Sequence, residues 1–239
     1  MFLRPRFLID SKEKLAEAVE KFQILPFFSN EVTGLSIEEM CASGKLFGGN
    51  FDEGSWEWKG PVIRTGNSAY GKFFRRKAGF VSIDILPDFL NYRRATYPVK
   101  KGSTDEMLLE IIRENYSLTS TELKSLIFGN KKRTSWDQFP GIGDETSIIT
   151  KRKSLESPLQ RLQMGGWIII SDFEYKKTKT GERYGWGVAR YSTPESVFRD
   201  TLNLSVKKSP MVSLHYIISS MKKNWTVMTR DKTWEKLLT

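Results

Sequence analysis

The chain has 239 residues and a mass of 27.6 kDa, enough for one large domain or two small ones. Its formal net charge is +10 and 13% of its residues are aromatic, which excludes a disordered tail and a histone-like protein. One cysteine, Cys41, and one histidine, His215, exclude an internal disulfide and a Cys/His zinc cluster. We therefore expect a cytoplasmic protein without metal or cofactor, and a structural role for His215. No apolar run is long enough to cross a membrane, and no apolar segment follows the basic start, so we expect neither a membrane anchor nor a secretory signal.

The positive charge is concentrated in three stretches of the chain. Residues 61–101 contain 9 basic and 2 acidic residues, residues 146–200 contain 10 and 6, and residues 201–239 contain 7 and 2. Such local concentration favours a surface that binds a polyanion, and nucleic acid is the polyanion that we expect. The alternative is a solvated basic surface that binds nothing in particular.

Two capping signals predict helices near the start of the chain. Ser11 precedes a helix over residues 12–22, and Ser36 with Glu39 forms a capping-box pattern for a short helix over 36–43. The first helix repeats apolar residues at helical spacing: Leu15, Ala18, Val19 and Phe22.

The next segment combines aromatic residues with chain breakers. Residues 56–63 predict strands that are broken at Gly60–Pro61. Pro87 predicts the start of a short helix that carries Arg93–Arg94. Pro98–Thr104 is the best candidate for a linker between two modules.

Three helices are predicted after this linker. The first covers residues 104–114, Thr119 or Ser120 caps the second, and Ser157–Pro158 opens the third. The residues expected to face inward are Leu108, Leu109, Ile111, Ile112, Leu123, Leu126, Ile127, Leu159 and Leu162.

A β-hairpin follows the third helix. Its strands are Trp167–Tyr175 and Arg183–Tyr191, joined by a polar turn. Three helices and then a hairpin is the order of a winged helix-turn-helix, in which the hairpin is the wing. We therefore predict an α+β fold with a winged-helix module over residues 104–200. It is preceded by an N-terminal α+β module over 1–101, for which a winged-helix-like fold is one option, and followed by a basic helical extension over 201–239. The alternative is a generic α+β module that ends in a hairpin.

Basic residues close to these elements are the candidates for contacts with DNA phosphates. On the third helix, Gln160 and Arg161 can also read base edges, because Gln pairs with adenine and Arg with guanine. The predicted DNA-binding residues are Lys72, Arg75, Arg76, Lys77, Arg93, Arg94, Lys151, Arg152, Lys153, Gln160, Arg161, Lys176, Lys177, Lys179 and Arg183.

Aromatic and basic residues alternate between positions 70 and 77. The basic side chains can reach phosphates, while Tyr70 or a phenylalanine can stack on an unpaired base. In the alternative interpretation Phe73, Phe74 and Phe80 belong to the core and only the cations point outward.

Few residues suggest catalysis. Asp84 and Asp88 are a candidate pair for general acid–base chemistry, but a strand end and a helix cap explain them more simply. Gly141-x-Gly143 lacks the third glycine and the lysine of a phosphate-binding loop, which argues against an NTPase.

Short motifs spread over residues 20–195 carry a family resemblance. They are Leu25–Phe28, Gly34–Glu39, Trp56–Pro61, Ala69–Phe74, Lys77–Phe80, Asn91–Arg94, Arg161–Met164 and Tyr184–Gly187. With these motifs the chain resembles the winged-helix DNA glycosylases of the AlkZ and YcaQ kind, and more closely the shorter AlkZ-related group.

The resemblance implies a DNA-binding scaffold. The glycosylases use a Gln-x-Gln or Gln-x-Asp motif that positions or activates the water attacking the sugar carbon. The resemblance places this motif in Leu25–Phe28, where Pro26 and Phe28 replace the two polar residues. It therefore implies DNA binding without the glycosylase activity.

The leading prediction is thus a DNA-binding protein with double-stranded DNA as its partner and no membrane association. One alternative is a DNA repair glycosylase for alkylated or cross-linked bases, with Asp84 as its altered catalytic residue. Another is a protein-interaction module that binds a partner through a surface rich in Trp and Phe.

Overall fold

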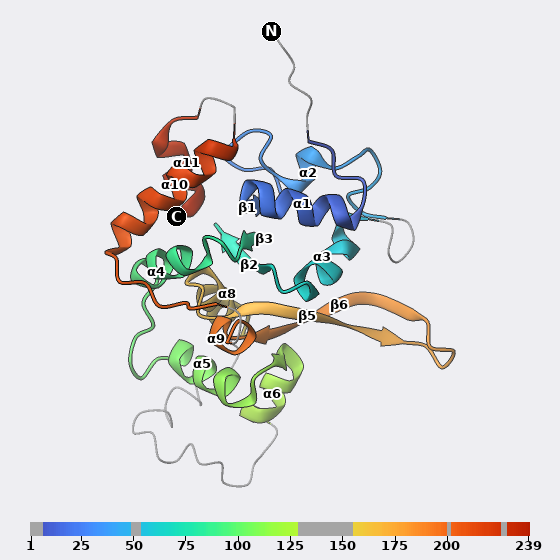
Figure 1. Ribbon diagram of the computed structural model, residues 1–239. Helices are drawn as coiled ribbons and strands as arrows, with labels where there is room; N and C mark the ends of the chain where they lie inside the picture. Colours follow the sequence, from blue (N-terminus) through green and yellow to red (C-terminus); the bar gives the residue numbers. More distant parts are fainter. Residues whose placement is uncertain (1–6, 49–53, 129–154, 200–201, 226–228) are drawn as a thin grey trace.

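The computed structural model describes residues 7–48, 54–128, 155–199, 202–225 and 229–239. Their elements form two three-stranded sheets, with strand orders β1-β3-β2 and β4-β6-β5. A long hairpin, β5–β6, separates two groups of elements: α1, α3 and the first sheet lie on one side, and α5 and α6 on the other (Figure 1). The chain therefore has the α+β composition that its sequence predicts.

The first sheet is antiparallel and pairs β1 (Ile24–Pro26), β3 (Lys77–Ser82) and β2 (Ser68–Phe74). Helix α1 (Lys12–Phe22) begins where Ser11 caps it, and α2 (Ile37–Met40) begins at the Ser36 cap. Helix α4 (Leu86–Thr96) has Pro87 in its first turn. The predicted positions of these three helices are confirmed.

Residues 55–64 form a helix, α3 (Ser55–Arg64), and the predicted strands at this place are wrong. Pro61 lies inside the helix and cannot donate a backbone hydrogen bond. Burial outweighs this loss, because Trp58 and Val62, four residues apart, both pack into the core of the N-terminal half. Because glycine and proline usually interrupt a helix, the apolar face that Trp58 and Val62 form was not recognised in the sequence.

The second half contains α5 (Thr104–Asn115), β4 (Leu118–Thr119), α6 (Ser120–Phe128), α8 (Glu156–Met164), β5 (Ile169–Lys177), β6 (Arg183–Ser192) and α9 (Pro194–Val197). Strand β4 pairs with β6, and β6 with β5, all antiparallel. The predicted helix at 104–114 and the predicted hairpin are confirmed.

Two details of this half differ from the prediction. Helix α8 begins at Glu156 after Leu155, so Ser157 is not its cap; Leu155 is buried and fixes the start of the helix by packing. Leu126 is 39% exposed, because the small core here takes in Leu123, and from the next turn of α6 Ile127 packs against it while Leu126 does not. The predictions for Gly141-x-Gly143 and for residues 151–153 lie outside the described residues.

Two hydrophobic cores hold the molecule together. The larger core is built by the first sheet with α1, α3 and α4, and the smaller core by α5, α6 and α8. The start of β5 joins them, because Ile168 packs in the smaller core while Ile169 and Ile170 pack in the larger one. The base of the long hairpin is therefore fixed between the two cores.

Two C-terminal helices, α10 (Pro210–Asn224) and α11 (Asp231–Leu238), pack on the larger core. Asp88 of α4 accepts a 2.6 Å hydrogen bond from Ser213 of α10 and pairs with Lys208 at 3.1 Å. The sequence had suggested that Asp88 caps α4. Instead, Asp88 connects α4 to α10 and to Lys208 before it. His215 lies exposed on α10. Within the described ranges, no helix is long and apolar enough to span a membrane.

Candidate nucleic-acid interface

The end of the β5–β6 hairpin carries a group of exposed cations. The hairpin runs out beyond the other elements, and its turn reaches the right-hand edge of the view (Figure 1). A 2.8 Å hydrogen bond from Thr178 N to Glu182 O closes the turn, and Gly181 supplies the positive φ that the turn needs. The exposed basic residues here, which we call the wing cations, are Lys176, Lys177, Lys179 and Arg183.

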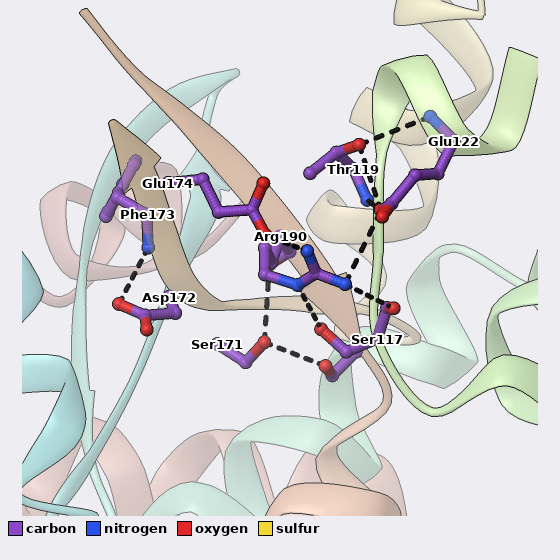
Figure 2. Close-up of polar contacts among 9 residues, drawn as sticks. Ser117, Thr119, Glu122, Ser171, Asp172, Phe173, Glu174 and Arg190 are labelled. Atoms are coloured by element: carbon purple, nitrogen blue, oxygen red, sulfur yellow. Dashed lines mark hydrogen bonds and ion pairs between the residues drawn. The ribbon is translucent and has the colours of Figure 1, made fainter. Parts of the chain in front are cut away.

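Arg190 of β6 connects this hairpin to Ser117 and to Glu122 of α6 (Figure 2). Its guanidinium donates to Ser117 Oγ at 3.0 Å and to Ser117 O at 2.9 Å, and it pairs with Glu174 on the neighbouring strand. It also lies 3.4 Å from Glu122. A backbone hydrogen bond from Thr119 and the charge of Arg190 lower the pKa of the Glu122 carboxyl, which keeps it ionised as a partner.

A second brace connects the same hairpin to the N-terminal half. Arg64, the last residue of α3, forms a 2.7 Å ion pair with Asp172 on β5. The Asp172 carboxylate also accepts a 2.8 Å hydrogen bond from the backbone N–H of Phe173. Ion pairs from both sides therefore fix the direction in which the hairpin presents its cations.

The β2–β3 hairpin ends in a second basic group. Arg75 and Arg76 form its two-residue turn, with φ values of 46° and 68°, and Lys77 follows. All three are exposed, whereas Tyr70 and the phenylalanines of this hairpin are buried. The prediction that these cations point outward is confirmed, and stacking of Tyr70 on a base is excluded by its burial.

Lys72 and Gln163 connect this hairpin to α8. A bulge in β2 turns the backbone N–H of Lys72 toward Gln163 Oε1, at 3.1 Å. Gln163 is buried and also donates to Leu159 O at 3.2 Å. The Lys72 side chain is half-buried. The backbone contact of Lys72 with Gln163 is structural, and a contact of its side chain with DNA stays a prediction.

Helix α8 carries the two predicted base-reading residues. Gln160 is half-buried on it. The Arg161 guanidinium is exposed, but it makes two hydrogen bonds to Asp105 of α5, at 2.6 and 2.8 Å. Arg161 can contact a guanine only by giving up this pairing.

Arg93 is fully buried, so its assignment to the DNA-binding surface is wrong. Its guanidinium donates to the carbonyl oxygens of Met164 at 2.6 Å, of Phe73 at 2.9 Å and of Leu238. It also lies 4.5 Å from the Tyr97 ring. Carbonyl dipoles and aromatic faces thus replace water around a charge that binds no phosphate.

The remaining predicted cations are dispersed. Arg94 pairs with Glu195 at 2.6 Å and lies 4.8 Å from the Trp167 ring. Helix α4, which carries it, lies on the opposite side of the view from the turn of the long hairpin (Figure 1). Lys151, Arg152 and Lys153 lie outside the described residues. The wing cations are therefore the most clearly exposed basic group on one braced element.

A cavity between the long hairpin and α3 was not foreseen from the sequence. It measures about 250 Å³, and Trp56, Tyr175 and Trp186 line it. Trp186 is 71% exposed. The signal in the sequence was a tryptophan between two glycines, Gly185 and Gly187, within a strand, since glycine there marks a bulge or a close approach.

Asp84 lies in a groove whose described lining residues include four acidic side chains and no basic one. It is exposed after the end of β3 and lines a groove along α1 together with Glu13, Glu17 and Glu20. The negative charge of this groove repels a phosphate backbone. These acidic surroundings give no support to Asp84 as a catalytic residue acting on DNA.

Pro26 and Phe28 line another cavity, of about 300 Å³, and Glu31 lines it with them. Glu31 pairs with Arg75. Burial opposes its ionisation, but hydrogen bonds from its own backbone N–H and from Arg75 outweigh burial and lower the pKa of its carboxyl. The part of the chain that the structure describes contains no group of three His, Cys, Asp or Glu side chains that could hold a metal ion.

The chain matches the sequence family described as AlkZ related over residues 9–239. No curated protein matches it. Among solved structures it is similar to the Streptomyces sahachiroi DNA glycosylase AlkZ, with 12% sequence identity and a TM-score of 0.49. That match covers 91% of this chain and 52% of the other, so this chain spans about half the length of that protein.

Proposed function

Because this chain belongs to the AlkZ-related family, we propose that it is a cytoplasmic protein that binds double-stranded DNA and lacks glycosylase activity. Binding uses a winged-helix module built from α5, α6, α8 and the β5–β6 hairpin, with the hairpin as the wing. The order helix, strand, helix, helix, hairpin and the pairing of β4 with β6 support this assignment.

The observation that carries the proposal is the wing itself. Its cations, Lys176, Lys177, Lys179 and Arg183, are exposed at the end of a hairpin that Arg190 and Asp172 brace from two sides. Lysine and arginine contacts to phosphates supply affinity without regard to base sequence. A fixed hairpin places these charges in the same position for every DNA molecule.

The absence of glycosylase activity is inferred from Pro26 and Phe28. The family resemblance places the catalytic polar motif at these two positions, and both are apolar here. A proline ring and a phenyl ring neither polarise a water molecule nor accept a proton.

The test is reversal of Lys177 and Lys179 to glutamate. We expect the affinity for duplex DNA to fall about 10-fold or more, equally for unrelated sequences, because two phosphate contacts are replaced by repulsion. The matched control, the α10 control, reverses the exposed Lys223 of α10 and the exposed Lys232 of the neighbouring α11; both helices lie on the opposite side of the molecule from the wing (Figure 1). Fluorescence anisotropy with labelled duplexes measures both.

Two results would contradict the proposal. One is an affinity that hardly changes between about 50 and 200 mM salt, since phosphate contacts require a steep loss over that range. The other is an equal loss for the wing variant and the α10 control, which would make net charge rather than the wing responsible.

A glycosylase remains the second candidate, because Glu31 offers a carboxylate in the cavity beside Pro26 and Phe28. Its lowered pKa keeps the carboxyl ionised, so it could act as a base and not as an acid. Release of free base from alkylated duplex DNA, lost in Glu31→Gln, would establish this activity. No release from the unaltered protein would exclude it for that substrate.

A further inference from the structure

The strand β6 contains a bulge that pushes one tryptophan outward. Lys176 pairs with Tyr184 and Glu174 with Val188, so Tyr175 alone faces Gly185, Trp186 and Gly187. Gly185 has a φ of 74°, which favours glycine, and a side chain at Gly187 would come within 2.8 Å of the Tyr175 ring. The two glycines therefore allow a conformation that leaves Trp186 71% exposed.

The exposed tryptophan forms one wall of the 250 Å³ cavity between the hairpin and α3. Trp56 lines the cavity beside it and meets Trp186 edge to face, with ring centroids 6.2 Å apart and ring planes at 84°. Tyr175 lines the same cavity. Pockets for drug-sized ligands measure about 300–1,000 Å³, so this one suits a single planar ring system.

Trp56 is held rigidly from behind. The rings of Phe27, Phe28 and Phe47 lie 5.2, 6.3 and 5.7 Å from it. The ammonium group of Lys59 lies 4.0 Å from the centre of the Trp56 ring and donates to the Trp56 backbone oxygen. A wall fixed in advance loses little conformational freedom when a flat ligand stacks against the site.

The charges around the cavity indicate what fills it. Glu57 lines it, so a phosphate is disfavoured inside. The Arg183 guanidinium lies 5.2 Å from the Tyr175 ring, so a cation stands beside the cavity. A ligand with a neutral aromatic ring inside and an anionic chain outside satisfies both, and this is the chemistry of a nucleotide in a single strand.

We propose that the cavity lined by Trp56, Tyr175 and Trp186 binds one unstacked nucleobase against the exposed Trp186 ring, while the wing cations contact the adjoining phosphates. The inference rests on the proposed DNA binding and names the preferred form of DNA: a strand, or a region of duplex, in which at least one base is unpaired. Stacking on an aromatic ring accepts any base, so the site selects for an exposed base and not for a sequence.

The experiment compares single-stranded oligo(dT) with a duplex of the same length, using fluorescence anisotropy and the quenching of tryptophan fluorescence. Trp186→Ala is expected to weaken oligo(dT) binding about 10-fold, to leave duplex binding within about twofold, and to remove most of the quenching. Trp186→Phe keeps a ring and is expected to retain most of the affinity. Tyr216→Ala, an exposed aromatic on α10 that is 46% exposed, is the matched control and should change neither probe.

The outcomes separate this inference from the proposed function. If Lys177→Glu with Lys179→Glu weakens both probes while Trp186→Ala leaves oligo(dT) binding and quenching unchanged, the base site is wrong and duplex binding stands. Equal losses on both probes for Trp186→Ala would mean that the tryptophan supports the hairpin and does not bind a base. Failure of the unaltered protein to bind either probe at low salt would overturn both proposals and favour a protein partner for the aromatic surface.

Discussion

The β2–β3 and β5–β6 hairpins both end in basic residues, but the molecule supports them differently. The first is buried along almost all of its length and ends in a two-residue turn with arginine at both positive-φ positions. The second is buried only at its base, and glycines take its positive-φ positions, Gly181 and Gly185. The two hairpin ends carry similar charge, but they differ in the burial of their strands and in the residues at their positive-φ positions.

The two hairpins therefore have different roles in the fold. The short hairpin is part of the core, since Phe73 and Phe80 are completely buried in it and Arg93 binds its backbone. The long hairpin contributes Ile169 and Ile170 to that core, with Phe173, Ala189 and Tyr191 partly buried against it, and extends its far end toward solvent. Binding residues are often found on such projections from a rigid scaffold. The following predictions test each side of this contrast.

The largest effect is expected from Arg93→Ala, which removes the support of the short hairpin. Three or more backbone carbonyls would lose a charged donor in the interior, at a cost of about 3–4 kcal/mol in the free energy of unfolding. Urea denaturation measures it. Arg94→Ala, at the next position, breaks a partly exposed ion pair and should cost less than about 1 kcal/mol. Equal costs would show that Arg93 contributes no more to the free energy of unfolding than Arg94 does.

A smaller effect is expected at Lys59, which lies behind the long hairpin, 4.6 Å from the Phe173 ring. Burial lowers the pKa of its ammonium group to about 8, against the ordinary value of 10.5. The unfolded chain therefore holds more protons between these pH values, so stability rises with pH from about 8 to 10.5. Below pH 8 the buried charge exerts its full cost.

Lys59→Met should therefore stabilise the protein at pH 7 by about 2 kcal/mol and remove this rise. Thermal or urea unfolding of both proteins at neutral and alkaline pH gives the comparison. If the variant is less stable at pH 7, the contacts of Lys59 with the aromatic rings outweigh its desolvation. That result would make Lys59 a support of the long hairpin and not a cost.

The smallest effect concerns the turn of the short hairpin. Replacement of Arg76 by Gly gives the residue that the second position of such a turn prefers, keeps the ion pair of Arg75 with Glu31, and should raise the free energy of unfolding by about 1 kcal/mol. The same variant loses one exposed cation and is expected to bind duplex DNA about two- to threefold more weakly. Chemical denaturation and anisotropy on one preparation test both. A more stable protein with unchanged affinity would confine DNA binding to the long hairpin.

Sequence-based predictions were most often right where the interactions are local, and wrong where residues far apart in the sequence meet. Ser11 and Ser36 locate helix starts through contacts three residues away, and such local signals were interpreted correctly. The helix at 55–64 was missed because its apolar face gains from packing that no local pattern reveals. Arg93 was misassigned for the same reason, since its partners Met164 and Leu238 lie 71 and 145 residues away.

The candidate site divides in the same manner. The wing cations follow from composition and the hairpin pattern, both of which are local. The aromatic cavity depends on the meeting of Trp56 and Trp186, two residues from elements far apart in the sequence. The glycines beside Trp186 marked an irregular strand, but only the folded chain shows what that irregularity faces.

Ile168, just before β5, packs in the smaller core, and the first two residues of β5, Ile169 and Ile170, pack in the larger one. Neither half of the chain can then separate without uncovering isoleucine side chains that the other half shelters. Excising residues 104–200 as an independent fragment would leave Ile169 and Ile170 without their packing partners, and such a fragment is prone to self-association. The whole chain should accordingly melt in one cooperative transition, with the long hairpin as the tie between its halves.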